Sequence, residues 1–416
     1  MDPGNIRIDL DRLWRTLDAS AQIGKGRANG LRRLALSDSD QDMRRLFVDW
    51  CKAEGLKVSR DSVANLFARR DGTDNDLPPV VIGSHLDTQV AGGRFDGILG
   101  VLAGLEVIRT LNETGVVTRH PIEVACWTNE EGARFQPPMM GSLTHIGALD
   151  LDWVRAQADD DGVSVGEELD RFDIECDVVP FKRIFDSYFE LHIEQAPELE
   201  RANVPVGVVV GGYKAHGLRV KLTGMTGHAG PTEMPERRDA LAAAAKIISS
   251  VYDIGCRFAD TGGKATSPRL LPWPNKPGII CEIADLTMDC RHPEPQEADA
   301  MLADIEAAIA THSETCGVDV EILQRWSFGD EVFSDELIEL VKNASDKIGA
   351  PHREMLSQAG HDAYAISRVA PTALIFSPCK DGISHNEAED IDRMQTEPGL
   401  NVLLHAVLAR ANRAAV

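Results

Sequence analysis

Short apolar runs that end in polar side chains recur along this chain. They occur at PPVVIGSH (78–85), PIEVACWTNEE (121–131), SYFELHIEQ (187–195) and PTALIFSPCKDGISH (371–385). Continuous apolar runs of this length are typical of strands buried on both faces of a sheet. Polar residues that follow such strands gather at their carboxyl ends, where open α/β sheets place their sites.

Helical patterns separate these predicted strands. Residues 95–115 (FDGILGVLAGLEVIRTLNETG) carry apolar side chains at helical spacing and stop at Gly115, and residues 335–350 predict a helix with an Asp335 cap and a Gly349 end. The alternation predicts an α/β domain with a central, mostly parallel sheet flanked by helices.

The pattern changes between residues 213 and 325. HGLRVKLTGMTGHAG and GIICEIADLTMDCRH alternate apolar and polar residues, as half-exposed antiparallel strands do, and helical stretches lie between and after them. We therefore expect a smaller α+β domain at 213–325, which would act as a lid and dimerisation domain, inserted into a discontinuous catalytic domain formed by residues 1–212 and 326–416. A chain of 416 residues is long for a single core, which agrees with two domains.

Composition narrows the possible partners. The formal net charge of -23 argues against nucleic acid or an anionic membrane as a partner, because surfaces that bind phosphate groups carry clustered Lys and Arg. The first residues, MDPGNIRIDLDRLW, lack the pattern of a secretory signal, and no stretch approaches the roughly 20 apolar residues of a membrane span. We expect a cytoplasmic protein whose eight scattered cysteines are reduced thiols.

Five residues, in the predicted strands, in the loops after them or in the turn that opens the 95–115 helix, have side chains of the types that bind divalent metals. They are His85, Asp96, Glu131, His192 and His385. Imidazole and carboxylate are donors that Zn²⁺, Mn²⁺ and Co²⁺ all accept, and five exceed what one ion usually takes from protein. A lone His at a strand end is more often structural, and a lone Asp before Gly is usually a turn residue. The conjunction of all five favours a two-metal hydrolase site.

Seven segments together resemble the hydantoinase/carbamoylase branch of the M20 metallohydrolases. They are GSHLDTQVAGGRFDGILGVLAGLE (83–106), WTNEEGARF (127–135), HIEQAPELE (192–200), GHAGPTEMPERRDAL (227–241), DLTMDCRHP (285–293), AGHDA (359–363) and GISHNEAE (382–389). That branch includes N-carbamoyl-L-amino-acid hydrolases, β-ureidopropionases and allantoate amidohydrolases. The resemblance implies hydrolysis of a carbamoyl or ureido C–N bond and two divalent metal ions per subunit.

The resemblance also implies how the ligands divide. Asp96 would bridge the two metals, since a carboxylate can present one oxygen to each ion. His85 and His192 would complete one site, and Glu131 and His385 the other. An imidazole at His192, where peptidases of the wider group usually carry an acid, favours the carbamoyl-hydrolysing branch.

Two further carboxylates have implied roles in catalysis. Glu130 would act as the general base and acid, moving a proton from the attacking water to the leaving nitrogen. Asp87, two residues after His85, would orient the ligand imidazole. A solvated loop position for Glu130 and a helix cap for Asp87 are the alternative interpretations.

Substrate contacts are implied at six residues. Arg291 has the planar fork that grips a carboxylate, so it and Asn275 would hold the acid end of the substrate. His228, between glycines, would polarise the scissile carbonyl from the partner subunit. The remaining implied contacts are Gln195, for the ureido group, and the loop residues Gly360 and His361. A surface ion pair (Arg291), a turn (Asn275) and a structural imidazole (His228, His361) are the alternatives.

The expected activity is hydrolysis of N-carbamoyl-L-amino acids or related ureido acids, releasing the amino acid, CO₂ and ammonia. Allantoate and β-ureido acids remain alternative substrates, and N-acyl amino acids or dipeptides a more distant one. A non-catalytic binding protein and a mononuclear zinc enzyme also stay open. Cys379 and Lys380 differ from the residues that are usual at these positions in the branch, and they could alter substrate specificity. The alternating strands of the inserted domain predict a sheet edge through which a homodimer forms.

Overall fold

The computed structural model describes residues 6–172, 177 and 183–413. The chain divides into two compact units, which are described separately below. The first contains residues Met1–Val210, Glu331–Ser357 and His361–Val416, and the second contains Gly211–Asp330 and Gln358–Gly360. Within the described ranges, no helix has the length and apolar character needed to cross a bilayer.

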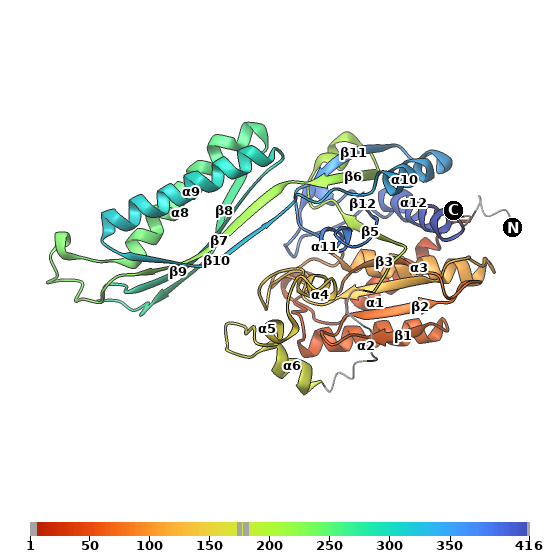
Figure 1. The fold of residues 1–416 in the computed structure, drawn as a ribbon, viewed down its shortest axis with the longest axis horizontal. Helices are drawn as coiled ribbons and strands as arrows, with labels where there is room; N and C mark the ends of the chain where they lie inside the picture. The colour runs from red at the N-terminus through yellow and green to blue at the C-terminus, as the bar shows by residue number, and fades with distance from the viewer. Residues whose placement is uncertain (1–5, 173–176, 178–182, 414–416) are drawn as a thin grey trace. The chain divides into compact units, whose positions relative to one another are not determined.

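An eight-stranded mixed sheet forms the centre of the first unit (Figure 1). Its order is β1-β2-β4-β3-β5-β12-β6-β11. The strands are β1 (Lys57–Arg60), β2 (Leu66–Arg70), β3 (Val80–His85), β4 (Ile122–Trp127), β5 (Ser187–Ile193), β6 (Val206–Gly212), β11 (His352–Ser357) and β12 (Thr372–Ser377). The neighbours β4, β3, β5 and β12 are parallel. Antiparallel pairs β1–β2, β2–β4 and β12–β6 flank them, so the predicted mostly parallel sheet is confirmed at its centre.

Helices cover both faces of this sheet. They are α1 (Leu10–Ser20), α2 (Asp38–Ala53), α3 (Ile98–Glu113), α4 (Met140–His145), α5 (Leu151–Arg155), α6 (Val165–Arg171), α7 (Glu198–Ala202), α10 (Asp335–Ile348), α11 (Asp362–Ser367) and α12 (Arg393–Ala411). On β5, the Leu191 side chain lies toward Gly399 of α12, whereas Glu190 accepts a hydrogen bond from the backbone of α11. Successive strand residues point to opposite faces, which places α12 and α11 on opposite sides.

Two helices predicted from periodicity form close to their expected bounds. The helix α3 is buried along nearly its whole length and ends before Gly115, which has a φ of 66°. The helix α10 ends before Gly349, at a φ of 70°. Its predicted Asp335 cap is wrong: Ser334 occupies the cap position, and Asp335 is the first helical residue, where its charge still favours the helix dipole.

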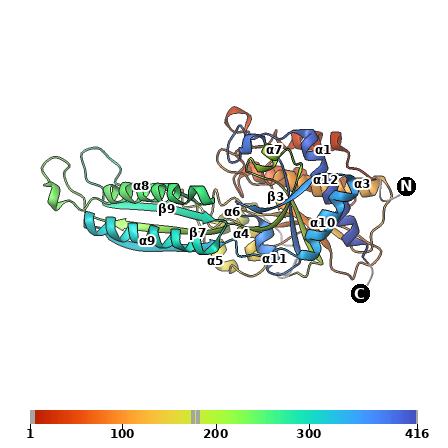
Figure 2. The ribbon, with the colours of Figure 1, turned by 90° about the horizontal axis from the view of Figure 1, so that it is seen from above.

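The second unit is a four-stranded antiparallel sheet with order β10-β7-β9-β8, covered by two helices. Its elements are β7 (Lys214–Thr223), α8 (Ala240–Phe258), β8 (Lys264–Trp273), β9 (Ile283–His292), α9 (Pro295–Cys316) and β10 (Asp319–Phe328). Figures 1 and 2 show α8 and α9 side by side along the sheet. The predicted small α+β fold with an antiparallel sheet is confirmed.

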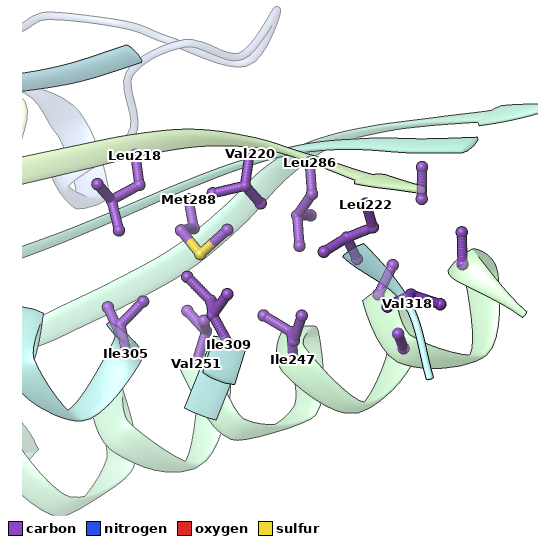
Figure 3. Close-up of a cluster of buried hydrophobic side chains, with 14 of the residues drawn as sticks. Leu218, Val220, Leu222, Ile247, Val251, Leu286, Met288, Ile305, Ile309 and Val318 are labelled. Atoms are coloured by element: carbon purple, nitrogen blue, oxygen red, sulfur yellow. The ribbon is translucent and has the colours of Figure 1, made fainter. Parts of the chain in front are cut away.

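The core of the second unit lies between the sheet and these helices. Alternate residues of β7 and β9 face α8 and α9 (Figure 3), and the cluster includes Leu218, Val220, Leu286, Ile247 and Ile305, all at most 1% exposed. The alternation that predicted half-exposed strands thus separates a buried apolar face from a polar one. Seven of the eight cysteines fall within the described ranges and are free thiols; Cys176 lies outside them.

Candidate metal centre

The five candidate ligands are brought together by four adjacent parallel strands. His85 ends β3, His192 lies one residue from the end of β5, Glu131 follows β4 by four residues, and His385 follows β12 by eight. Because parallel strands end at the same edge of a sheet, residues 300 positions apart in sequence meet there. Asp96 reaches the same place from the turn that precedes α3.

Asp96 stands between two groups of donors. Its Oδ1 lies 3.2 Å from His192 Nε2 and 3.9 Å from His85 Nε2. Its Oδ2 lies 3.4 Å from His385 Nε2, which is itself 3.2 Å from Glu131 Oε2. In each group, His85–Asp96–His192 and Asp96–Glu131–His385, the donor atoms lie within 4.8 Å of one another.

The imidazoles of His85 and His192 are oriented with their Nε2 atoms toward the site. His85 Nδ1 lies 2.9 Å from the carbonyl oxygen of Asp87, and His192 Nδ1 lies 2.9 Å from that of Ile193. An Nδ1–H that donates to a carbonyl leaves the Nε2 lone pair available, which is the arrangement of metal-binding histidines.

The ionisation of these groups follows from their mutual contacts. Burial opposes the charge on Asp96, but hydrogen bonds from His192 and His385 hold its pKa well below the usual range. Burial also lowers the pKa of His192, but the hydrogen bond and charge of Asp96 prevail and raise it to about 9. The pKa of His385 rises to about 11 because the charge of Glu131 and the hydrogen bond to Asp96 outweigh burial. A buried carboxylate is thus matched by cationic partners.

Glu130 and Glu131 lie in different environments although they are adjacent. Glu131 accepts hydrogen bonds from the backbone and side-chain amides of Gln89 and faces His385. Glu130 is buried, and its Oε2 lies 3.5 Å from His85 Nε2. Burial, followed by the charges of Asp362 and Glu131, raises the pKa of Glu130 well above its usual value. A carboxyl group whose pKa is raised in this way holds a proton more readily than an exposed glutamate does.

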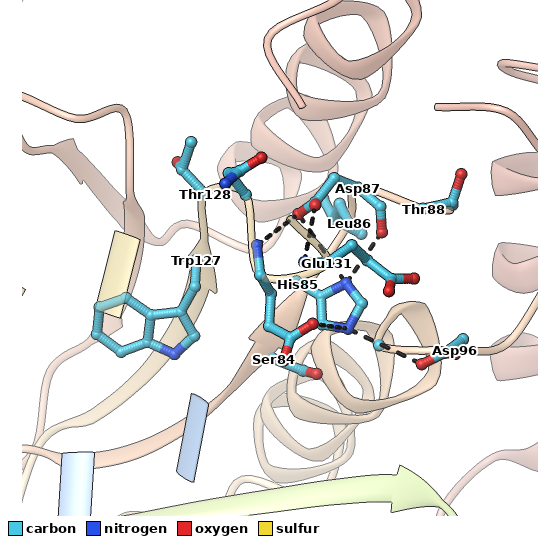
Figure 4. A network of polar contacts seen from close by, with 12 residues as sticks. Ser84, His85, Leu86, Asp87, Thr88, Asp96, Trp127, Thr128 and Glu131 are labelled. Atoms are coloured by element: carbon cyan, nitrogen blue, oxygen red, sulfur yellow. Dashed lines mark hydrogen bonds and ion pairs between the residues drawn. The ribbon is translucent and has the colours of Figure 1, made fainter. Parts of the chain in front are cut away.

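The carboxylate of Asp87 binds backbone groups (Figure 4). It accepts the backbone N–H groups of Glu130 and Glu131, each at 3.3 Å, while its Oδ1 stays 4.0 Å from His85 Nδ1. The hydrogen bond that orients His85 is instead donated by its Nδ1–H to the Asp87 carbonyl oxygen. Asp87 therefore connects the strand end carrying His85 to the loop carrying both glutamates, which differs from the expected carboxylate–imidazole contact and from a helix cap.

The donor set fits divalent metal ions. Asp96 and Glu130 are buried and Glu131 is half-buried, yet within the described ranges the ion pairs of all three are with histidines only. Gathering several carboxyl groups in one buried cluster is costly even where histidines are their partners. Divalent cations held by His and carboxylate donors would neutralise that charge.

Three predicted substrate contacts lie in or beside this cluster. The Gln195 side-chain amide donates to Asp96 Oδ2 at 2.9 Å, and its Oε1 is buried with no hydrogen-bond partner among the described residues. The His361 ring packs edge-on against His192, with centroids 4.4 Å apart, and its Nε2 lies 3.1 Å from Ser357 Oγ. Burial holds the pKa of His361 well below its usual value, so its ring is neutral. Gly360 immediately precedes His361 and is half-buried.

Several residues of the site had no role assigned from sequence. Glu389, in the loop after His385, accepts the backbone N–H of Asp96, and Ser384 donates to the Asp96 carboxylate. Glu190 lies two residues before His192, on the same face of β5, and accepts hydrogen bonds from Ser84 and from the backbone of Ala363. Their positions in quoted motifs, one to four residues from a ligand, were the only available signal.

Cys379 and Lys380 lie in different surroundings. The Cys379 thiol is buried, 3.7 Å from the carbonyl oxygen of Ala196, and burial raises its pKa to about 12. Lys380 has a largely exposed side chain, 3.9 Å from an Asp390 carboxylate oxygen. A thiol with so high a pKa is not a nucleophile at neutral pH.

The remaining candidates, His228, Asn275 and Arg291, belong to the second unit. His228 is exposed in the loop after β7, where its Nδ1 accepts a hydrogen bond from the Gly230 backbone. Asn275 is exposed in the loop between β8 and β9, with a φ of 45°. Arg291, on β9, lies 3.2 Å from Asp289 and donates to the carbonyl oxygen of Gln358.

Arg291 lies at the opposite end of the sheet from the other two. It pairs in register with Lys264 at the start of β8, whereas Trp273 at the end of β8 pairs with Ile283. His228 forms a bridge to Ile279 beyond that second end. At about 3.3 Å per residue, the eight residues from 283 to 291 separate the two ends by roughly 26 Å. These three side chains therefore do not form one cluster within a single chain.

Comparison with known proteins agrees with this geometry. The family model for peptidase family M20/M25/M40 matches residues 81–409. The chain is 42% identical to an N-carbamoyl-L-amino-acid amidohydrolase of Rhizobium meliloti, covering 98% of both chains. It is 35% identical to another of that name from Geobacillus stearothermophilus, covering 96% of this chain and 98% of the relative.

A solved structure supports the same assignment. A hydantoinase/carbamoylase family amidase from Burkholderia vietnamiensis aligns with a TM-score of 0.94 and 42% identity, covering 99% of this chain and all of that one. The seven motifs predicted this outcome, and the match extends over both units. The chain belongs to the M20 hydrolase family and, within it, to the hydantoinase/carbamoylase amidases.

Proposed function

We propose that this protein hydrolyses the carbamoyl C–N bond of N-carbamoyl-L-amino acids with the help of two divalent metal ions. The observation that carries the proposal is the position of Asp96, whose two oxygens face separate donor groups. Relatives named for this activity at up to 42% identity over nearly the whole chain support the substrate class.

The proposed metal ligands are His85 and His192 on one side of Asp96, and Glu131 and His385 on the other. When bound there, two divalent ions would polarise the scissile carbonyl and lower the pKa of an attacking water. Zn²⁺, Mn²⁺ and Co²⁺ all suit these donors.

Glu130 is proposed to move the proton. It would accept a proton from water as the water attacks the carbamoyl carbon, then deliver it to the departing amine nitrogen. Its burial and raised pKa support both halves of this transfer. One water is consumed, the C–N bond to the amino acid breaks, and the carbamate that leaves decomposes to CO₂ and ammonia.

Four side chains are proposed to recognise the substrate. The buried Oε1 of Gln195, beside Asp96, can accept a hydrogen bond from the ureido NH₂. Arg291 can grip the substrate carboxylate through two hydrogen bonds, exchanging its contact with Asp289. Asn275 would add a contact to the same acid group, and His228 one to the carbonyl oxygen.

The separation within the second unit supports a homodimer. A substrate of amino-acid size cannot span the roughly 26 Å between the Arg291 end of the sheet and the end that bears His228 and Asn275. We therefore propose that His228 and Asn275 act on a substrate held by Arg291 of the other subunit. The edge strands β8 and β10 offer surfaces through which such a dimer could form.

A substrate panel tests the proposed reaction. Metal-free protein would be reconstituted with Zn²⁺, Mn²⁺ or Co²⁺ and given N-carbamoyl-L-amino acids, N-carbamoyl-β-alanine, allantoate, N-acetyl amino acids and dipeptides. We expect fastest ammonia release from the N-carbamoyl-L-amino acids. Faster turnover of allantoate or of the β-ureido acid would reassign the substrate, and cleavage of N-acyl substrates alone would indicate an aminoacylase. Inactivity on every member would leave only a binding role.

Glu130→Gln tests the proton-transfer role. The substitution keeps the size of the side chain but removes its basicity, so kcat should fall by about 10²-fold or more. Metal content, measured by elemental analysis, should stay at two ions per chain, whereas one ion at saturation in the unchanged protein would indicate a mononuclear enzyme. Activity of Glu130→Gln close to that of the unchanged protein would remove Glu130 from the mechanism.

A further inference from the structure

Glu389 is buried against the turn that carries Asp96. It is 4% exposed, and its Oε1 accepts the backbone N–H groups of Phe95 at 2.9 Å and Asp96 at 3.1 Å. A single carboxylate oxygen therefore fixes two consecutive peptide groups directly before α3. Backbone N–H groups buried at such a turn need acceptors, and one oxygen of Glu389 serves both.

The other oxygen of Glu389 reaches the segment that carries His385. Its Oε2 lies 3.1 Å from Ser384 Oγ, and the same hydroxyl lies 2.7 Å from Asp96 Oδ2. Ser384 directly precedes His385, which has a φ of 53°. Glu389 thus contacts both the turn holding Asp96 and the residue adjacent to His385.

The glycine-rich turn is shaped around this carboxyl group. A Cβ atom added at Gly93 would lie 2.0 Å from Glu389 Cδ and 2.1 Å from its Oε1. Gly93 is not among the residues with positive φ, so its backbone does not require glycine. The absence of a side chain at Gly93 is what admits the Glu389 carboxyl group.

We propose that Glu389 is a positioning residue for the metal centre. It holds Asp96 and His385 at the separation that two metal ions require. It does so by accepting hydrogen bonds from the backbone of residues 95–96 and by contacting Ser384. It touches no donor atom of a proposed ligand, and its effect passes through the backbone of residues 95–96 and through Ser384. The proposal rests on the function proposed above, because it concerns the same metal ligands.

Two substitutions separate hydrogen bonding from charge. Glu389→Met keeps the length of the side chain and removes both acceptors, so we expect Mn²⁺ to bind at least about tenfold more weakly, as for other residues that orient metal ligands. Glu389→Gln retains an acceptor oxygen for the two N–H groups and an NH₂ that can donate to Ser384, so Mn²⁺ affinity should stay within about twofold. Affinity is measured by titrating metal-free protein with Mn²⁺ and following the EPR signal of the unbound ion.

Glu387→Met is the matched control. Glu387 lies in the same loop, and its carboxylate pairs with Arg27 instead of the metal centre. This variant should bind Mn²⁺ like the unchanged protein. Gly93→Ala should reproduce the weakening seen in Glu389→Met, because its Cβ would displace the carboxyl group. Equal affinity in Glu389→Met and the unchanged protein, or an equal loss in Glu389→Gln and Glu389→Met, would overturn the proposal.

A readout without metal distinguishes this proposal from the proposed function. Amide hydrogen exchange in metal-free protein, read in peptides that cover residues 93–97, should be faster in Glu389→Met than in the unchanged protein and in Glu389→Gln. Equal exchange in all three would overturn the positioning role even if the enzyme is an amidohydrolase. Failure of the unchanged protein to bind Mn²⁺ would instead refute the proposed metal site, while the exchange comparison would still decide whether Glu389 holds the turn.

Discussion

His192 and His385 approach different oxygens of the Asp96 carboxylate, and in metal-free protein each carries a proton where the proposed function requires a metal ion. The pKa of His192 is raised to about 9 and that of His385 to about 11, so both imidazoles are cationic at neutral pH. Metal binding must displace these protons. Proton and metal therefore compete for the same Nε2 atoms.

The stability of metal-free protein should fall as pH rises. His192 has a folded pKa above its unfolded value, so its stabilising contribution is complete below about pH 6.5 and is lost as pH rises through about 9. Glu389 acts in the same direction, since burial raises its pKa to about 8 and the folded state keeps its proton longer than the unfolded state. Urea unfolding of EDTA-treated protein should show a lower midpoint at pH 9 than at pH 6.5.

Protein saturated with Mn²⁺ is the control for this measurement. Its ligands are already deprotonated, so the midpoint should not fall over the same range. A metal-free midpoint that is unchanged or higher at pH 9 would contradict the raised pKa values.

Individual ligands could be predicted from sequence because each lies in a short motif of distinctive residue types. The hydrogen bonds that hold these ligands in place could not be predicted from sequence. That Glu389 binds the backbone of Asp96 depends on two segments 293 residues apart, and that Gln195 donates to Asp96 depends on segments 99 residues apart. Such contacts follow from tertiary structure and leave no periodic signal in the sequence.

Among the elements, the four parallel strands were predictable and the flanking ones were not. The strands β3, β4, β5 and β12 are continuous apolar runs, because both of their faces are buried. The edge strand β1 and the antiparallel β2 are short and partly exposed, so their pattern is weak. The start of α10 was misplaced by one residue because Ser334 and Asp335 are both common caps.

The start of α3 is the element boundary on which the metal centre depends most. Gly97 caps this helix with a φ of 69°, and a Cβ there would lie 2.2 Å from His85 Nε2. Gly97→Ala should therefore displace the imidazole and weaken Mn²⁺ binding at least tenfold, in addition to a cost of about 1–3 kcal/mol for an alanine in this sparsely populated backbone conformation.

Gly115→Ala isolates the backbone effect. Gly115 follows the other end of α3 with a φ of 66°, and a Cβ there would meet no atom within 4 Å. This variant should lose about 1 kcal/mol in urea unfolding and retain its Mn²⁺ affinity. If Gly97→Ala binds Mn²⁺ as tightly as Gly115→Ala, the close approach of Gly97 to His85 has no role in metal binding.

At the scale of the whole molecule, the proposed dimer predicts that each active site needs residues from two subunits. If each site combines Glu130 of one subunit with His228 of the other, neither Glu130→Gln nor His228→Ala is active alone. Coexpression of the two in equal amounts would give half mixed dimers, each with one intact site, so about a quarter of full activity should return.

Differently tagged subunits allow the mixed dimer to be purified and assayed directly. Recovered activity would place Glu130 and His228 of one site on different chains. A mixed dimer as inactive as its parents would contradict the sharing of residues between subunits. A fully active monomer would exclude it as well.

The position of β12 has a consequence for how the protein is made. This strand lies between β5 and β6, although residues 213–371, which include nearly all of the second unit, separate β6 from it in the chain. During synthesis, the second unit can fold as one nearly continuous segment. The central sheet stays incomplete, without the strand between β5 and β6, until residues 372–377 leave the ribosome. The metal site, which also needs the His385 loop, is complete only after that strand has entered. Until then the facing edges of β5 and β6 are open to pairing with other chains, which makes the last stage of translation the period of greatest aggregation risk.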